Sequence, residues 1–366
     1  MKIQKIYAEV VGVPETRNLA GLPVEPPTVR NFVVAHVLTD DGIEGLGLAF
    51  HFYADPLTKA LHSAIEELGA LLTGFDPQQT EAVAARLHAA AWGAGPGGIF
   101  ALALSAIDIA LWDIQGKARG LPLWKLLGGH RSRVPVYASG TVRRELSDAD
   151  AVRCVQALAE QGFPAVKIQT ALAAPTSPGR EAARARLLRR ELDPAVALMA
   201  DANQGWRLEQ AIDICRRLED VGLAWMEDAI AHDDFAGLAR LAAALSTPVA
   251  GGEYLWGIAP FAQMIAAHSV DILIVDLFRV GGVTQWLKVA GMAQAFNLPV
   301  ASHVIPEIAG HLVAARPNGL TVEYVPWSLP LFEDTPRVER GELALTDRPG
   351  LGLALDGEFV RRHKVL

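Results

Sequence analysis

The stretch VALMADANQGWRLEQAIDICRRL (residues 196–218) holds the repeating unit on which most of the chain is built. A short apolar run leads to Asp201, and an amphipathic pattern with helical period fills 208–218. A strand followed by a helix is the beginning of a βαβ unit, whose strands pair in parallel. The stretch therefore predicts an α/β architecture with a carboxylate at the carboxyl end of a strand.

The same unit recurs along the chain from about residue 134 onward. Short apolar runs alternate with helical patterns at 149–160, 180–190, 208–218, 235–245, 260–267 and 285–296. So many units in succession favour a closed βα barrel over an open sheet. We place this barrel at residues 131–325 and expect the alternation to stop after Glu323.

The first part of the chain has a different pattern, typical of a small α+β domain at residues 1–130. Strands are predicted at 3–11 and 32–38, with a hairpin turn at Asp41-Gly42. The proline-rich segment 14–27 between them is predicted to be a long loop that acts as a lid. Helices are expected at 57–72, 77–91 and 99–119, and residues 326–366 are expected to return to this domain.

Composition narrows the classes of protein that fit. The chain has 366 residues, is 51% hydrophobic and carries a formal net charge of −8, which argues against nucleic-acid and anionic-membrane partners. Cys154 and Cys215 have no metal-ligand spacing and are predicted to be buried thiols. No signal-peptide pattern or membrane span is expected, since Ser105 and Asp108 interrupt the apolar stretch 99–112. We expect a cytoplasmic protein.

Polar residues stand where the apolar runs end, about 20 to 27 residues apart from Asp201 onward. They are Lys167, Asp201, Glu227, Glu253, Asp276, His303 and Glu323. In a closed barrel these strand ends meet at one face, which is where active sites of such barrels lie. Taken singly, each residue is explained as well by a helix cap, a loop salt bridge or a structural histidine. Together they favour one functional site.

Asp201, Glu227 and Glu253 form an all-oxygen set on successive strand ends. Clustered carboxylates repel one another and raise each other's pKa unless a cation joins them. Hard cations prefer such ligands, so Mg²⁺ is predicted, with Mn²⁺ as the alternative. Asp228 directly follows Glu227, and by strand alternation we expect its side chain to point elsewhere.

Asp276 and His303 lie on neighbouring predicted strands. A carboxylate beside an imidazole sets its tautomer and raises its pKa, which makes His303 a candidate proton shuttle. Lys167 supplies a cation, Gln169 shares its face, and Asn203 could hydrogen-bond a metal ligand.

These segments resemble the enolase superfamily, mandelate racemase subgroup. The resemblance covers nearly the whole chain and rests on AIDIALWDIQG (106–116), VKIQ (166–169), DAN (201–203), ED (227–228), GE (252–253), DLFRVGG (276–282), SH (302–303) and Glu323. It implies a modified (β/α)₇β barrel, a modified TIM barrel, with an N-terminal α+β capping domain.

The resemblance also implies roles for particular residues. Asp201, Glu227 and Glu253 would hold Mg²⁺, and His303 paired with Asp276 would be the acid/base catalyst. Lys167 would help to neutralise the substrate carboxylate, and Glu323 would donate a hydrogen bond to it in protonated form. We assign Gln169, Asn203 and Arg279 to substrate binding. A homo-oligomer, from dimer to octamer, is implied as well.

One departure from the family pattern bears on the reaction. The subgroup usually carries Lys-x-Lys at the second barrel strand, the later lysine being a base on the opposite face of the substrate; here that position is Gln169. A two-base racemase needs acceptors on both faces, whereas a dehydratase can work with His303 alone. We therefore expect an acid-sugar dehydratase that converts its small carboxylate substrate to a 2-keto-3-deoxy acid.

Two alternatives remain open from the sequence. One is a racemase, epimerase or lactonising enzyme of the same fold, and the other is a barrel that only binds a metal or carboxylate. The capping domain is expected to select the substrate through Arg17, His51 and Tyr53.

Overall fold

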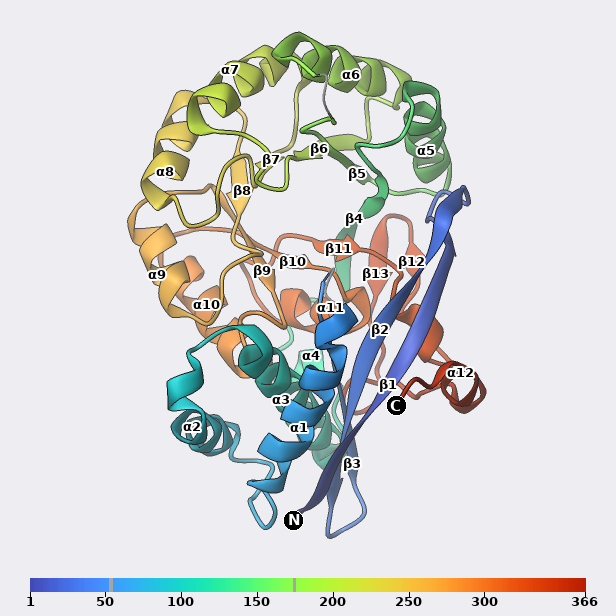
Figure 1. The fold of residues 1–366 in the computed structure, drawn as a ribbon, viewed down its shortest axis with the longest axis vertical. Helices are drawn as coiled ribbons and strands as arrows, with labels where there is room; N and C mark the ends of the chain where they lie inside the picture. Colours follow the sequence, from blue (N-terminus) through green and yellow to red (C-terminus); the bar gives the residue numbers. More distant parts are fainter. Residues whose placement is uncertain (53–54, 174–175) are drawn as a thin grey trace.

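The computed structural model describes residues 1–52, 55–173 and 176–366. A long antiparallel sheet and a helical layer lie against one side of a ring of alternating strands and helices (Figure 1). The sheet has the order β1-β2-β3, formed by β1 (Ile3–Arg17), β2 (Pro23–Thr39) and β3 (Glu44–Phe50). This is the predicted capping domain, and it places one strand pair beside the mouth of the barrel.

The prediction of a long loop at 14–27 is wrong. Strands β1 and β2 continue to pair through Pro14↔Val29 and Arg17↔Pro23, so only a short turn separates them. Beyond β3 the two strands form a ribbon with free edges, where the missing N–H of proline costs no ladder hydrogen bond. The tip of this arm reaches the barrel, where Gln161 Nε2 donates to Leu19 O at 3.1 Å. The segment is thus a paired two-stranded arm that reaches the barrel.

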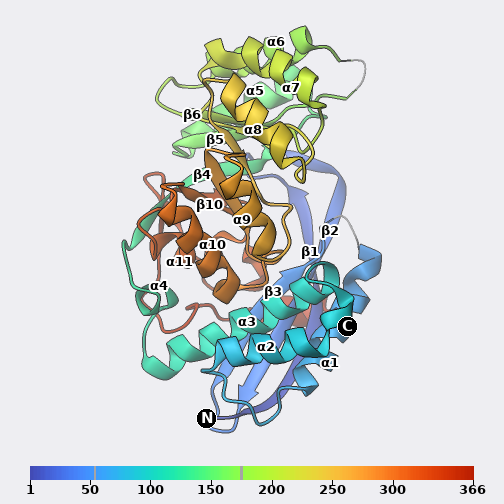
Figure 2. The ribbon, with the colours of Figure 1, turned by 90° about the vertical axis from the view of Figure 1, so that its left-hand side faces the viewer.

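Four helices complete the capping layer: α1 (Thr58–Ala70), α2 (Thr80–Ala90), α3 (Gly98–Arg119) and α4 (Leu123–Leu126). Short 3₁₀ turns lie at Asp55–Leu57 and Trp92–Ala94. Helix α3 packs directly on β3, because a Cβ built at Gly47 would stand 1.8 Å from Ala106 O. Figure 2 shows α3 running between the capping sheet and the barrel.

Helix α3 is also the one described helix that is long and apolar enough to cross a membrane by length and composition. The interruptions at Ser105 and Asp108 therefore do not by themselves exclude this stretch on composition. Ser105 and Asp108 do not break the helix, since Ser105 Oγ donates to Leu102 O and Asp108 accepts from Thr284. Because 83% of the apolar window is buried in protein, its composition is that of a core helix.

The barrel contains eight parallel strands and seven helices among the described residues, as a (β/α)₇β barrel requires. The strands are β4 (Arg133–Val142), β5 (Ala165–Gln169), β6 (Ala197–Asp201), β7 (Met226–Glu227), β8 (Val249–Gly251), β9 (Ile272–Asp276), β10 (Val300–His303) and β11 (Val322–Tyr324). The helices are α5 (Asp148–Glu160), α6 (Pro178–Glu191), α7 (Leu208–Leu218), α8 (Phe235–Ala244), α9 (Ala259–Ala266), α10 (Val283–Ala295) and α11 (Pro306–Ala314).

Strand register brings the predicted residues to one level. Gln169 pairs with Asp201, Asp201 with Glu227, and Asp276 with His303 across neighbouring strands. The ring closes where β11 pairs with β4 and Val300 bridges to Gly319. Large side chains fill the interior below this level, among them Tyr137, Met199, Trp225 and Ile274. The barrel is therefore a packed core with a polar rim.

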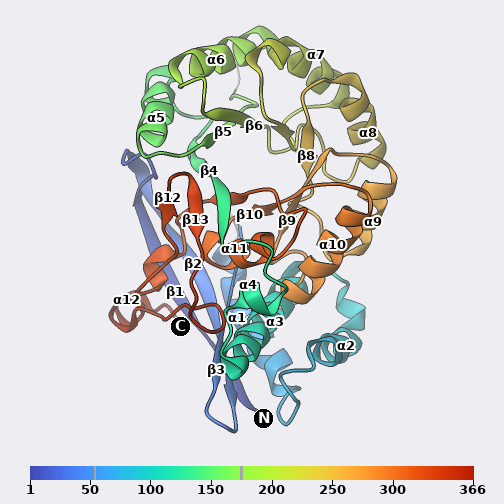
Figure 3. The same cartoon turned by 180° about the vertical axis from the view of Figure 1, so that it is seen from behind.

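The remaining segment runs along the outside. A 3₁₀ turn (Leu329–Leu331) leads to β12 (Val338–Glu339) and β13 (Glu342–Ala344), and β13 pairs antiparallel with the start of β4 (Figure 3). After α12 (Gly357–His363) the chain reaches β1, where Val11 bridges to Lys364. Cys154 and Cys215 are free and buried, as predicted.

Candidate active site

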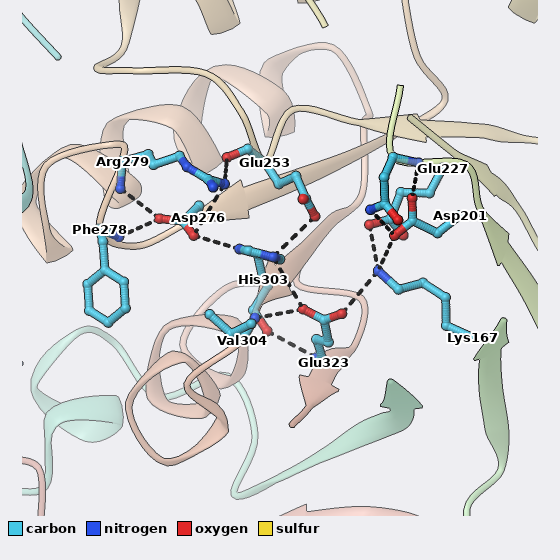
Figure 4. Close-up of polar contacts among 12 residues, drawn as sticks. Lys167, Asp201, Glu227, Glu253, Asp276, Phe278, Arg279, His303, Val304 and Glu323 are labelled. Carbon is cyan, nitrogen blue, oxygen red and sulfur yellow. Dashed lines mark hydrogen bonds and ion pairs between the residues drawn. The ribbon is translucent and has the colours of Figure 1, made fainter. Parts of the chain in front are cut away.

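The strand ends deliver seven polar side chains to one buried volume at the barrel mouth (Figure 4). Each is less than a tenth exposed, although all are charged or titratable: Lys167, Asp201, Glu227, Glu253, Asp276, His303 and Glu323. A cavity of about 300 Å³ opens above them. Charged groups are rarely buried unless they are paired, so such a set in one cavity marks a functional site.

Lys167 holds three of the carboxylates. Its Nζ lies 2.6 Å from Glu227 Oε1, 3.0 Å from Glu323 Oε1 and 3.4 Å from Asp201 Oδ2. Burial works to lower the pKa of Lys167, but the surrounding carboxylates raise the pKa well above its usual value. The residue is therefore a fixed cation, suited to hold an anionic substrate group.

Asp228 joins the carboxylate cluster, contrary to the expectation that it points elsewhere. Ligand atoms of Glu227, Asp228 and Glu253 all lie within 4.8 Å of one another. Strand β7 ends at Glu227, and Asp228 adopts a positive φ of 42°, so strand alternation no longer sets the direction of its side chain. The sequence argument failed because it extended the strand by one residue.

Asp201 lies next to this cluster, and its two oxygens accept hydrogen bonds from Asn203. The backbone N of Asn203 donates to Oδ1 at 2.8 Å, and its Nδ2 donates to Oδ2 at 2.9 Å. Asn203 thus touches the predicted ligand as expected, although its φ of 44° shows that it stands beyond the strand. The role of Asp201 as a metal ligand stays a prediction.

The cluster fits a divalent cation on its own chemistry. Every donor is an oxygen, the set that hard cations prefer. Asp228 Oδ2 is buried and has no hydrogen-bond partner among the described residues. Burial first, and then the neighbouring carboxylates, raise the pKa of Asp228 and Glu227 well above their usual values. A cation shared by Glu227, Asp228 and Glu253 would relieve this repulsion.

His303 and Asp276 form the predicted dyad. Asp276 Oδ2 lies 2.6 Å from His303 Nδ1, and its Oδ1 accepts from the backbone N of Phe278 and Arg279 at 2.8 and 2.7 Å. Burial works to lower the pKa of His303, but Glu253 and Asp276 raise it to about 9. His303 Nε2 points toward Glu253, 3.3 Å away. The dyad therefore fixes which nitrogen faces the cavity.

The surroundings of Glu323 favour its charged form in the absence of substrate. Burial works to raise its pKa, but Lys167 and His303 lower it to about 2. Its Oε2 also accepts from the backbone N of Val304 at 2.7 Å. Two cations beside the carboxylate outweigh the effect of burial on its pKa. Glu323 can become neutral only if an arriving substrate carboxylate takes over those cations. The protonated Glu323 therefore stays a prediction for the substrate complex.

Backbone strain follows directly after His303. Val304 and Ile305 both have positive φ, 44° and 49°, a region that β-branched residues rarely adopt. Both side chains are buried, and the conformation aims the Val304 N–H at Glu323. Strain of this kind persists where the surrounding packing enforces it, and it often marks active sites.

Two other predicted binding residues, Gln169 and Arg279, line the cavity. Gln169 lines the cavity, and its Oε1 accepts from the backbone N of Arg144 at 3.3 Å. Arg279 also lines it, but Nη1 donates to Glu253 O at 2.8 Å and the guanidinium lies 4.7 Å from the Phe52 ring. This engagement favours a positioning role over substrate binding.

Of the capping-domain residues that were predicted to select the substrate, Arg17 and His51 do not line this cavity. Arg17 is exposed and donates to Gly21 O, and His51 Nδ1 lies 3.1 Å from Phe52 O. Tyr53 lies outside the described residues. The direct contact of the capping domain comes instead from Phe52, whose ring lies 5.1 Å from that of His303. In the sequence, an aromatic residue that contacts the catalytic histidine looks the same as one that packs in the core, so Phe52 could not be predicted.

Comparison with known proteins agrees with this geometry. Residues 8–128 match the mandelate racemase/muconate lactonizing enzyme N-terminal domain, and residues 150–359 match the enolase C-terminal domain-like family. The chain belongs to the mandelate racemase/muconate lactonizing enzyme family of the enolase superfamily. The predicted fold and family are confirmed.

Members of this family similar to the chain differ in reaction. L-talarate/galactarate dehydratase of Salmonella typhimurium is 33% identical over 92% of this chain and 83% of its own length. The 3,6-anhydro-alpha-L-galactonate cycloisomerase of Streptomyces coelicolor is 32% identical over 92% and 93%. L-talarate dehydratase from Polaromonas sp., solved with Mg and L-glucarate, superposes with a TM-score of 0.91 at 31% identity, covering 100% of this chain and 98% of that one.

Proposed function

We propose that this protein is a Mg²⁺-dependent acid-sugar dehydratase. One observation carries the proposal: the His303–Asp276 dyad faces the cavity, while the position that would supply a second base holds Gln169, whose amide cannot take a proton. Dehydratases among the relatives and magnesium in the solved neighbours support this choice. The choice of dehydration over isomerisation therefore rests on a single-base site.

The residues suggest a sequence of proton transfers. Lys167 and Glu323 bind the substrate carboxylate, and His303 Nε2 removes the α-proton. Bound Mg²⁺ would supply Lewis-acid stabilisation of the charge that develops on that carboxylate. His303 then returns the proton to the β-hydroxyl, which leaves as water, and the enol product tautomerises to a 2-keto-3-deoxy acid. Because one imidazole serves both transfers, we expect syn elimination.

His303 must be neutral before it can accept a proton. The carboxylate of Glu253 contributes to the pKa of about 9. When Glu253 shares its charge with a cation, this contribution shrinks and the imidazole approaches the range of a base. Asp276 stays hydrogen-bonded at Nδ1 throughout, so that Nε2 is the atom that exchanges protons.

The alternatives make different predictions in one experiment. The purified protein is incubated with an acid-sugar library in D₂O with Mg²⁺, and NMR follows both loss of substrate and exchange of the α-proton. Dehydration should produce a 2-keto-3-deoxy acid and stop with EDTA. Exchange without dehydration would favour the racemase or epimerase, and a bicyclic or lactone product the lactonising enzyme. Binding without exchange or turnover would favour the noncatalytic barrel.

The substitution His303→Asn tests the catalytic assignment. We expect dehydration to fall by about 10³-fold, since general acid–base catalysis contributes roughly 10²–10⁴-fold. Exchange of the α-proton should fall together with it. The control His88→Asn lies on α2, outside the cavity, and should keep full activity. A His303→Asn protein that still dehydrates its substrate would exclude this mechanism.

A further inference from the structure

A second, larger cavity adjoins the catalytic one. It has a volume of about 880 Å³ and shares Gly140, Gln169, Asn203 and Tyr254 with the catalytic cavity. Its walls are the β1–β2 arm on one side, and the end of β4 with the segment 143–153 on the other. This space is therefore open to the far end of a substrate held by Lys167.

Arg144 stands where the two cavities meet. Its Nη2 donates to Asn203 Oδ1, its Nη1 donates to Ala171 O at 3.3 Å, and Asn203 in turn donates to Asp201. One asparagine side chain thus spans the gap between the carboxylate cluster and this guanidinium. A guanidinium has five N–H groups, so Arg144 retains donors for a ligand.

Arg143 lines the same cavity and is half-buried. Within the described parts of the chain, its side chain has no ion pair or hydrogen bond. Its backbone is fixed, because Arg143 O accepts from Arg184 Nη2 at 3.2 Å and Arg184 Nη1 also reaches Leu146 O at 2.8 Å. The cationic side chain is therefore presented from a rigid backbone without a partner of its own.

The acidic residues of this cavity do not cancel these charges. Glu15 pairs with Arg30 at 2.9 Å, and the carboxylate of Asp150 pairs with Arg153. The remaining two, Glu25 and Glu145, are exposed, where water screens their field. Arg143 and Arg144 are thus the cations of this wall that lack a carboxylate partner among the described residues.

We propose that Arg143 and Arg144 bind a second carboxylate, so that the preferred substrate is a sugar diacid. The inference rests on the proposed function, which places the first carboxylate at Lys167. A carboxylate matches the planar fork of a guanidinium and forms charge-assisted hydrogen bonds with it. A monoacid ends in a hydroxymethyl group at this position and leaves the guanidinium donors without a carboxylate acceptor. A site built for such an acceptor binds the monoacid more weakly.

The test measures binding of matched acid pairs by calorimetry in the presence of Mg²⁺. The panel contains the hexaric acids and the hexonic acids of the same configuration, galactarate with galactonate and glucarate with gluconate among them. We expect the best diacid to bind at least about 30-fold tighter than its monoacid partner, since hydrogen bonds between charged groups are stronger than those to a neutral hydroxyl. Arg143→Met and Arg144→Met should each lower the affinity for the diacid about 10-fold and the affinity for the monoacid less than about 3-fold.

Two controls separate recognition from damage. Arg153→Met removes an arginine of the same cavity that already pairs with Asp150, and should leave both affinities unchanged. Arg144→Lys keeps the charge and should retain part of the diacid preference. Equal affinity for diacids and monoacids, or an equal loss of both in Arg144→Met, would overturn the inference, because Arg144 would then act only through Asn203.

Turnover in the same samples tests the proposed function separately. A diacid that binds tightly through both arginines but is neither dehydrated nor exchanged would refute dehydration and leave the diacid site standing. Monoacids dehydrated as efficiently as diacids would refute the diacid site and leave dehydration standing. A panel in which no diacid binds more tightly than its partner counts against the diacid site.

Discussion

Asp228 shows how a single residue trades stability against metal binding. Its carboxylate is buried beside Glu227 and Glu253, and Oδ2 is unpartnered among the described residues. Asp228→Asn removes one charge from this repulsive group, so the metal-free protein should gain about 1 kcal/mol or more. Its affinity for Mg²⁺ should fall by about 10- to 100-fold. Thermal unfolding with and without Mg²⁺ measures both effects.

The control for this prediction is Asp233→Asn, an exposed carboxylate a few residues further along the same loop. It should change neither the melting temperature without metal nor the rise that Mg²⁺ produces. If Asp228→Asn destabilises the metal-free protein while keeping the full Mg²⁺ response, the carboxylate is a structural acceptor and not part of the cation site.

Residue types at strand ends could be predicted from the sequence, whereas their charge states and directions could not. The seven polar positions follow from spacing alone, because a barrel brings its carboxyl strand ends together. The direction of Asp228 depends on where β7 stops, and the ionised Glu323 depends on the positions of Lys167 and His303. Distances of a few ångströms decide both, and a linear pattern does not contain them.

At the scale of elements, helix α11 carries a buried titratable group outside the catalytic mechanism. Glu307 Oε1 accepts from Ser328 Oγ at 2.5 Å, Oε2 has no partner among the described residues, and burial raises the pKa of Glu307 to about 7. The native state thus binds this proton more tightly than the unfolded state. Stability from Glu307 is present below its ordinary pKa near 4.5 and is lost as pH rises toward 7.

Glu307→Gln removes this pH dependence. Between about pH 5 and about pH 8, the wild type should lose at most about 3 kcal/mol of unfolding free energy relative to the variant. Urea unfolding at several pH values measures the difference. Parallel curves for the two proteins would mean that Glu307 stays ionised, or stays protonated, across the whole range.

Most elements follow from hydrophobic periodicity, and the exceptions have physical reasons. Helix α7 begins and ends where the pattern predicts, since its apolar face is unambiguous. The arm formed by β1 and β2 was predicted as a loop because its prolines suggest irregular structure. Its pairing depends on a partner strand and on free edges, which are tertiary properties.

Within the capping domain, helix and sheet are held together by a close packing contact. Helix α3 rests on β3 at Gly45 and Gly47, and a Cβ at Gly47 would meet Ala106 O at 1.8 Å. Gly47→Ala should therefore cost about 3 kcal/mol or more, because neither backbone can move away without unpacking the helix. Gly291→Ala, on the exposed side of α10 with no atom within 4 Å, should instead stabilise the protein by about 0.5–1 kcal/mol.

Chemical denaturation of these two variants compares an enclosed glycine with an open one. If Gly47→Ala unfolds at the wild-type midpoint, the contact between α3 and β3 is looser than described. The order of barrel strands could be predicted from the repeat, because consecutive units pair as neighbours. The seating of α3 on the capping sheet could not, since it depends on two glycines whose only signal is the absence of a side chain.

The strained junction at Val304 and Ile305 has a consequence for protein engineering. Each residue stores on the order of 1–3 kcal/mol in its left-handed backbone, so directed evolution toward heat tolerance would be drawn to glycine or asparagine there. Such replacements would loosen the turn that aims an amide at Glu323 and carries the catalytic imidazole. Selections for thermostability in this scaffold should therefore measure activity in every round, because the substitutions that most readily raise stability lie next to the catalytic histidine.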